Sequence, residues 1–87
     1  MVSIRSYASG APNSNCMRVQ VGKLYLYFSY TTIVAYSADG ETVCCENNWG
    51  CTTGKHLNWI EPDKKKRIGE DTFETLLTKV LKKHNLL

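Results

Sequence analysis

The chain has 87 residues, 43% of them apolar and 22% charged, with eleven basic and eight acidic side chains and a net charge of +3. This length allows one domain with a thin core, because a chain of this size buries only about 60% of its surface on folding. The sequence contains no apolar run of the roughly 18 residues that a membrane span needs, and its start lacks the apolar block of a secretion signal. The apolar content also excludes intrinsic disorder. We therefore expect a cytoplasmic protein that does not act at a membrane.

Residues 1–16 show neither the alternation of a strand nor the periodicity of a helix. The segment is rich in Ser, Asn, Gly and Pro, a composition typical of disordered chain ends. We expect a flexible tail over residues 1–16 and a single domain over residues 17–87.

The first regular pattern is a β-hairpin. Apolar and polar residues alternate over 17–21 and 24–30, and the two residues between them begin with Gly22, which suits a tight turn. Pairing across this turn puts Val21 opposite Leu24 on the core face and Arg18 opposite Tyr27 on the outer face.

A second hairpin follows directly. The β-branched run 33–36 leads into Asp39-Gly40, a favoured dipeptide of type I′ turns, and the chain returns over 42–46. This turn pairs Tyr36 with Val43. Four strands in sequence predict an antiparallel meander.

Two helices are predicted after the strands. The first runs over 53–60, with Thr53 as its N-cap and an end before Pro62; Leu57, Ile60 and Trp59 would face the sheet. The second is amphipathic, because its apolar residues recur at the spacing of one helix face. These residues are Phe73, Leu76, Leu77, Val80 and Leu81.

The second helix carries charges that suit its ends. Asp71 and Glu74 have the spacing of a capping box, and Lys82, Lys83 and His84 lie in the last turn, where the helix dipole favours basic groups. The predicted fold is therefore α+β: a four-stranded antiparallel meander with both helices packed on one face.

The four cysteines do not form a familiar metal-binding pattern. Cys44 and Cys45 are adjacent on a predicted strand and point to opposite faces, and the spacing from Cys45 to Cys51 and His56 matches no usual zinc site. We favour structural free thiols and no metal or other cofactor, with a metal site, a disulfide or a reactive Cys51 as the alternatives.

The segment from Gly50 to His56 resembles a phosphate-binding loop but has the wrong spacing. Three residues rather than four separate its glycines, and His56 replaces the hydroxyl residue that would hold magnesium. A turn leading into a helix is the simpler interpretation, although Gly54 and Lys55 at a helix start also suit an anion. His56 and His84 have no recognisable nucleophile partner, so we expect no enzyme.

The positive charge is concentrated in two segments. Residues 54–67 and 75–87 together carry +6, and the remainder carries −3. The run Lys64-Lys65-Lys66-Arg67 suits phosphates, and Arg18 beside Tyr25 and Tyr27 suits single-stranded nucleic acid. A solvated charge run and an ordinary cross-strand pair explain the same residues without any ligand. The candidate binding residues are Arg18, Tyr25, Tyr27, Lys55, His56, Lys64, Lys65, Lys66 and Arg67.

Three stretches resemble a small family of uncharacterised proteins from bacteriophages and mobile elements. They are the run from Met17 to Tyr36, the segment Thr52-Thr-Gly-Lys-His-Leu-Asn-Trp-Ile, and Glu61-Pro-Asp-Lys-Lys-Lys-Arg-Ile. The resemblance covers about Met17 to Leu81, so residues 1–16 lie outside it, and Cys44, Cys45 and Cys51 are not part of its pattern. It implies no assigned activity.

These observations predict a small non-enzymatic binding protein. On the resemblance, it would modulate a host protein or ribonucleoprotein complex in the host cytoplasm, as an inhibitor of host defence of the anti-CRISPR type. The alternative is a nucleic-acid-binding accessory protein that uses the basic segment 54–67 and the sheet face with Arg18, Tyr25 and Tyr27.

Overall fold

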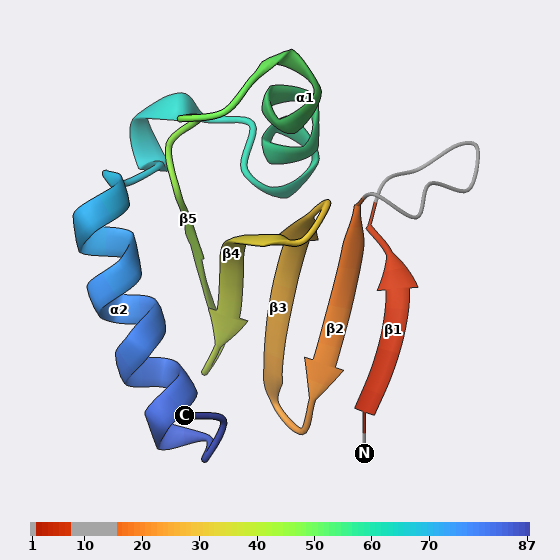
Figure 1. Ribbon diagram of the computed structural model, residues 1–87, viewed down its shortest axis with the longest axis vertical. Coiled ribbons are helices and arrows are strands. Elements are labelled where there is room, and N and C mark those ends of the chain that lie inside the picture. Colours follow the sequence, from red (N-terminus) through yellow and green to blue (C-terminus); the bar gives the residue numbers. More distant parts are fainter. Residues whose placement is uncertain (1, 8–15) are drawn as a thin grey trace.

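Five antiparallel strands form one sheet, and two α-helices follow them in the chain (Figure 1). The computed structural model describes residues 2–7 and 16–87. The strands are β1 (Val2–Ser6), β2 (Met17–Val21), β3 (Leu24–Ser29), β4 (Thr32–Ala38) and β5 (Glu41–Cys44). The helices are α1 (Cys51–Ile60), the short 3-10 helix η1 (Lys64–Lys66) and α2 (Glu70–Lys83). The α+β class and the meander are confirmed.

The sheet has one strand more than the sequence predicts. β1 pairs with β2 over its whole length, from Val2 opposite Val21 to Ser6 opposite Met17, within the segment expected to be a flexible tail. Cys16, the last residue of that segment, is fully buried. The rest of the expected tail, residues 1 and 8–15, lies outside the described residues.

Both predicted hairpins form with the predicted registers. Arg18 lies opposite Tyr27 and Val21 opposite Leu24 in the first, and Tyr36 lies opposite Val43 in the second. Asp39 and Gly40 have φ values of 54° and 78°, as a type I′ turn requires.

A β-bulge changes which side chains of β4 point to each face of the sheet. The register between β3 and β4 shifts after Tyr27. Tyr27 lies opposite Ala35 and Phe28 opposite Ile33, so Val34 is an extra residue with no opposing residue on β3. Two consecutive residues of a bulged strand can therefore lie on the same side. Val34 and Ala35 both join one buried cluster, whereas Tyr36 joins the other.

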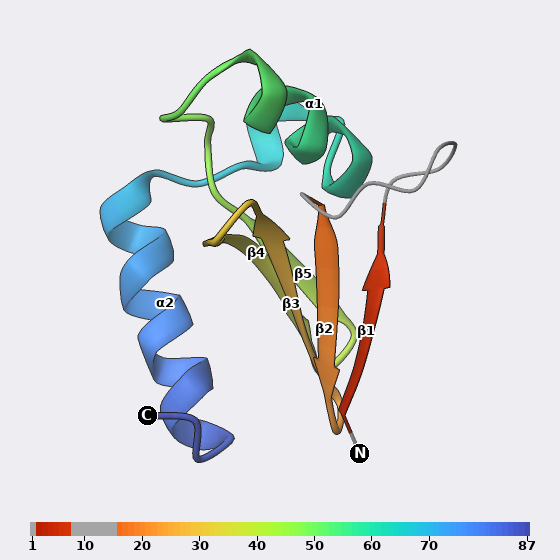
Figure 2. The ribbon, with the colours of Figure 1, turned by 45° about the vertical axis from the view of Figure 1, so that its right-hand side comes forward.

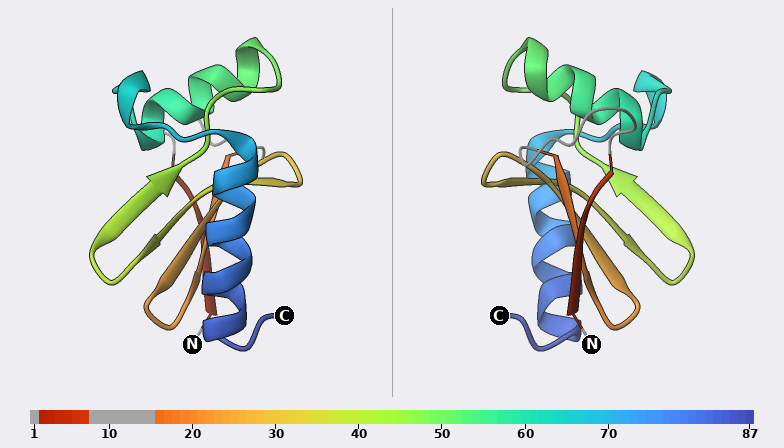
Figure 3. Two further views of the ribbon diagram at one scale, coloured as in Figure 1. Left: turned by 90° about the vertical axis from the view of Figure 1, so that its left-hand side faces the viewer. Right: turned by 90° about the vertical axis from the view of Figure 1, so that its right-hand side faces the viewer.

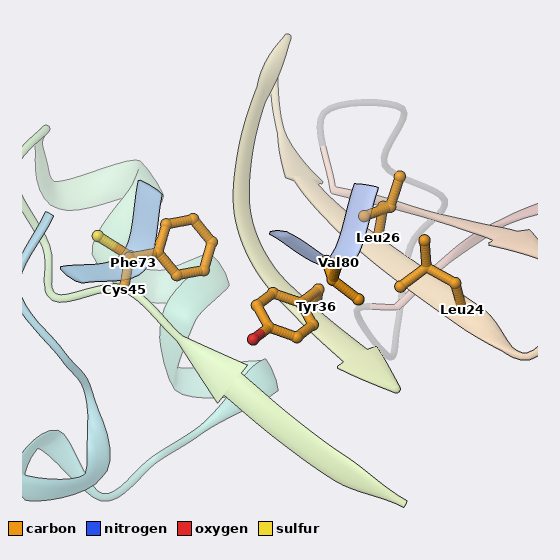
Figure 4. Packing of buried hydrophobic residues seen from close by; sticks show 6 residues of the cluster. All are labelled: Leu24, Leu26, Tyr36, Cys45, Phe73 and Val80. Carbon is orange, nitrogen blue, oxygen red and sulfur yellow. The ribbon is translucent and has the colours of Figure 1, made fainter. Parts of the chain in front are cut away.

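The two helices pack on opposite faces of the sheet, which corrects the prediction of one shared face. α2 places Phe73 and Val80 against Leu24, Leu26 and Tyr36 (Figure 4). α1 crosses the end of the sheet (Figure 2), and Leu57 there packs against Val34, Ala35 and Cys44. An apolar helix face predicts burial, but it does not say against which side of a sheet.

The helix starts also differ from the predicted caps. α1 begins at Cys51 after Gly50, so Thr53 lies inside the helix rather than capping it. α2 begins at Glu70 after Gly69 with no side-chain cap, so Asp71 and Glu74 do not form a capping box. Glu70 and Asp71 still occupy the first turn, where the helix dipole favours them.

The outer edge of β5, away from β4, is closed by the segment that precedes α2. The Ile68 N–H donates to Cys44 O at 2.9 Å, and the Glu46 N–H donates to Ile68 O at 2.8 Å. Figure 3 shows α2 lying along one face of the sheet, with α1 across its end. Within the described part of the chain, no helix has the length and apolar character to cross a membrane.

Replacing Leu57 by alanine should destabilise the protein by about 2–5 kcal/mol, because it removes the fully buried side chain that holds α1 on the sheet. The free energy of unfolding from urea denaturation measures this effect. Trp59→Ala on the same helix is the matched control: its side chain is 52% exposed, so its change should stay within about 0.5 kcal/mol. Equal losses in the two variants would contradict this packing.

Candidate nucleic-acid interface

A hollow lies between α1 and the segment that contains η1. Its volume is about 540 Å³. Three basic side chains, one acidic side chain and two amides line it: Lys55, Lys64, Arg67, Glu46, Asn47 and Asn58, together with Gly54. We call it the basic hollow. Its surplus of positive charge and its amide donors are chemistry that suits a phosphate or another anion.

The outer surface of α1 extends this basic hollow with an aromatic side chain. Thr53, His56 and Leu57 face inward and are buried, whereas Trp59 is 52% exposed. Trp59 shares a shallow depression with Lys55 and Asn58, two residues that also line the basic hollow. The expectation that Trp59 packs on the sheet is therefore wrong. Trp59 is exposed because the buried residues Thr53, His56 and Leu57 occupy a different side of the helix.

Arg67 is held in place by the end of α1. Its Nε and Nη2 donate to the Glu61 carbonyl oxygen at 3.1 and 2.9 Å, and Nη2 also donates to Asn58 Oδ1 at 2.7 Å. These contacts bring the segment after Pro62 back against the helix. They also fix the guanidinium at the wall of the basic hollow.

The predicted basic run does not act as one unit. Asp63 Oδ1 accepts from the Lys65 N–H at 3.0 Å and starts η1. Lys64 and Arg67 line the basic hollow, whereas Lys65 and Lys66 are exposed and lie outside its lining. The turn of η1 thus separates four consecutive basic residues into two pairs with different surroundings.

Gly54 allows the wall of the basic hollow to form. Asn47 lies against it, and its Nδ2 donates to Gly50 O at 3.2 Å. A Cβ on Gly54 would come within 2.9 Å of that nitrogen. A glycine inside a helix costs about 1 kcal/mol relative to alanine, and this close approach is the reason for it here.

His56 lies in the interior, which corrects its placement among surface residues. It is 3% exposed, and its Nδ1 lies 2.7 Å from Ser29 Oγ. Ser29 Oγ is also 2.9 Å from Thr53 Oγ1. Burial lowers the pKa of His56, because it disfavours the charged imidazolium. The three side chains form a buried polar link between β3 and α1 and do not face a partner.

Tyr7 belongs to the same region, although the sequence places it in the expected tail. Its hydroxyl donates to Phe28 O at 2.9 Å, and its ring meets Tyr27 edge-on with 5.6 Å between centroids. The Tyr7 ring also lies 6.2 Å from that of His56. Burial raises the pKa of Tyr7, and Cys16 and Cys44 add to the shift. Tyr27 is thus part of an aromatic cluster rather than a free surface.

A second basic surface occupies the outer face of β1 to β3. Arg18 stacks on Tyr25 with 4.9 Å between Cζ and the ring centroid, and it lies opposite Arg5 across the β1–β2 pair. Arg5 was not among the predicted residues. Directly opposed like charges are unfavourable in a sheet, and the cation–π contact with Tyr25 offsets part of that cost.

The cysteines show no arrangement for metal or thiol chemistry in the residues that can be placed. Cys44 and Cys45 are buried free thiols. Burial raises the pKa of each to about 11, so both stay protonated at neutral pH and are poor nucleophiles. Over residues 2–7 and 16–87, no three His, Cys, Asp or Glu side chains are grouped to hold a metal ion. The side chain of Cys51 lies outside this description.

The structure thus divides the predicted site into separate parts. Lys55, Lys64 and Arg67 meet at the basic hollow. Arg18 and Tyr25 share the sheet face, while Tyr27 and His56 are drawn inward. Together with the fold, these surfaces define a small α+β protein with a basic and aromatic helix surface.

The chain belongs to a family of unknown function (DUF8033), whose model matches residues 4–75. The match begins within β1 and so includes part of the segment 1–16, which lies outside the resemblance described above. Neither a curated protein nor a solved structure matches the chain.

The buried position of His56 predicts a pH-dependent stability. The unfolded chain takes up a proton on this residue with a pKa near its ordinary value of 6.5, whereas the folded state resists protonation. The unfolded state therefore binds more protons below that pH, and the free energy of unfolding should fall as the pH drops below 6.5.

Urea denaturation over a pH series measures this loss of stability. His56→Gln should show a smaller loss on acidification than the wild type, whatever its stability at neutral pH. Parallel pH profiles for wild type and His56→Gln would show that His56 is not the titrating group.

Proposed function

We propose that this protein is a non-enzymatic nucleic-acid-binding protein that contacts its ligand through the basic hollow and Trp59. The observation that supports the proposal most directly is the convergence of Lys55, Lys64 and Arg67 on one hollow beside an exposed tryptophan. Proteins that hold single-stranded nucleic acid combine cationic grooves for the phosphates with aromatic rings on which bases stack. Both elements occur here on one surface.

A binding role suits the chemistry better than catalysis. The Ser–His hydrogen bond between Ser29 and His56 is buried and joins α1 to the sheet. Arg67 is immobilised by three hydrogen bonds, which is a suitable state for a group that positions a phosphate. Lys55 and Lys64 are exposed and free to adapt.

A protein partner is the second candidate, and the exposure of Trp59 next to the basic hollow that Arg67 lines favours it. Trp and Arg are enriched among the residues that dominate protein interfaces. On the resemblance to bacteriophage and mobile-element proteins, that partner would be a host protein or ribonucleoprotein, and the role would be inhibition of host defence. The salt dependence of binding separates the two candidates, because phosphate contacts release counterions.

Neutralising the basic hollow should weaken nucleic-acid binding and reduce its dependence on salt. Fluorescence anisotropy of a labelled single-stranded oligonucleotide, titrated over a range of salt concentrations, gives the slope of log K against log salt. Lys55→Gln and Lys64→Gln should each reduce the magnitude of that slope by about 1. Arg67 is left unchanged, because its removal would also release the segment it anchors.

Two control variants test whether the hollow itself matters. Lys65→Gln removes a neighbouring charge outside the hollow, and Lys79→Gln removes an exposed charge on α2. Both should leave the slope close to that of the wild type. A Lys65 effect as large as that of Lys64 would indicate a diffuse charge run, and absence of binding at low salt would overturn the proposal.

Trp59 should contribute by stacking on a base. Trp59→Ala should cost about 1–3 kcal/mol of single-strand affinity, and it should affect a duplex of the same sequence less, because paired bases are not available for stacking. In a Trp49→Phe background, oligonucleotide should quench the remaining tryptophan fluorescence. Trp49→Ala is the control for loss of an exposed indole. Unchanged affinity in Trp59→Ala would remove the stacking contact from the model of binding.

A further inference from the structure

The outer edge of β1 offers unpaired backbone groups. β1 is the last strand of the sheet and pairs only with β2 among the described strands. The Tyr7 N–H donates to Cys16 O at 3.1 Å, and these two residues continue the β1–β2 register. Because hydrogen-bonding direction alternates along a strand, Ser3 and Arg5 also point their backbone groups toward β2. Those of Val2, Ile4 and Ser6 therefore point outward.

This edge carries little protection against pairing with another strand. Natural edge strands are usually guarded by charge, proline or a bulge. The middle residue here is Ile4, whose side chain is 61% exposed. Arg5 is the one charged residue in β1, and its side chain lies on the opposite face from that of Ile4.

The apolar surface around Ile4 continues onto the next strand. Ile4 lies opposite Val19, and Val19 lies opposite Leu26, so all three share the face that α2 covers further along the sheet. No residue of β1 or β2 belongs to either buried cluster as described. Met17, Val19 and Val21 are half-buried. The edge and this adjoining apolar face form one continuous surface.

We propose that two copies of this chain pair through their β1 strands, antiparallel and centred on Ile4. Ile4 of one copy then lies opposite Ile4 of the other, Val2 opposite Ser6, and Ser3 opposite Arg5. Each outward-facing pair exchanges two backbone hydrogen bonds, so the contact contains about six. The two sheets become one continuous antiparallel sheet, and the interface is isologous.

The alternative registers are less favourable. Only registers that pair outward-facing residues with each other satisfy the backbone groups. Moving the centre to Arg5 places the two arginines directly opposite, which is destabilising. Moving it to Ser3 leaves fewer outward-facing pairs. The register centred on Ile4 forms the most hydrogen bonds, joins the two apolar side chains and keeps each arginine beside a serine.

The contact is small, so the dimer should form reversibly with concentration. Sedimentation velocity over a dilution series of the full chain, up to about 1 mM, measures this association. Ile4→Lys should abolish the dimer by placing two ammonium groups side by side at its centre. The substitution should not prevent folding, because the Ile4 side chain is mostly exposed. Thr42→Lys, an exposed position on β5, is the matched control and should still dimerise.

Cysteine cross-linking tests the register separately. In the proposed pairing only Ile4 faces its own copy, with Cα atoms about 5.5 Å apart, a spacing that a disulfide spans. Ile4→Cys should therefore form a disulfide-linked dimer on mild oxidation, and Ser6→Cys should do so far more slowly. A monomer at every concentration, or a dimer that Ile4→Lys leaves intact, would overturn the proposal. Equal cross-linking at the two positions would overturn the register.

Discussion

The arrangement of the whole molecule depends on β4, which is buried on both faces. Val34 and Ala35 turn toward α1, and Tyr36 turns toward α2. An antiparallel strand in a small protein commonly has one face in water, so burial of both faces requires a helix on each side. The register shift between β3 and β4 adds to the burial on the α1 side, because it lets the consecutive residues Val34 and Ala35 pack toward the same helix. The exposed faces of β1 and β2 are the part of the sheet that these two helices leave uncovered.

The sequence predicts the hairpins and helices that depend on neighbouring residues. It does not predict the features that depend on residues far apart in the chain. The Asp39-Gly40 turn determines its own hairpin register, and the apolar stripe around Phe73 determines a helix. β1 was missed because Val2 to Arg5 alternates over too few residues to stand out before a segment rich in Ser, Gly and Asn. Its pairing with β2 is a contact between segments distant in sequence, which no local pattern predicts. The face chosen by α1 depends likewise on Ala35 and Cys44, which are remote in sequence.

The candidate site shows the same division. Basic character in residues 54–67 is visible in the composition, and the outward position of Trp59 follows from the helical spacing of Leu57 and Ile60 once α1 is known to begin at Cys51. The convergence of Lys64 with Lys55 is not visible, because it depends on Arg67 folding the chain back onto the Glu61 carbonyl. His56 was misplaced for a related reason: a histidine beside a lysine resembles a surface pair, yet neighbours in a helix point in different directions. The Ser29 hydroxyl that satisfies His56 is supplied by a different strand.

The uneven coverage of the sheet explains why two unrelated surfaces exist on so small a protein. α1 and α2 both pack on β3, β4 and β5, and this leaves β1 and β2 with partial burial on either side. On one face of those strands the uncovered residues are apolar and surround Ile4; on the other they are polar and include the opposed pair Arg5 and Arg18. A chain of this length has too few residues to cover both faces of five strands. The strands that the helices cover least, β1 and β2, are therefore where a second molecule would bury the most apolar surface. The basic hollow and Trp59 lie on a different part of the molecule, on α1 and the segment that contains η1.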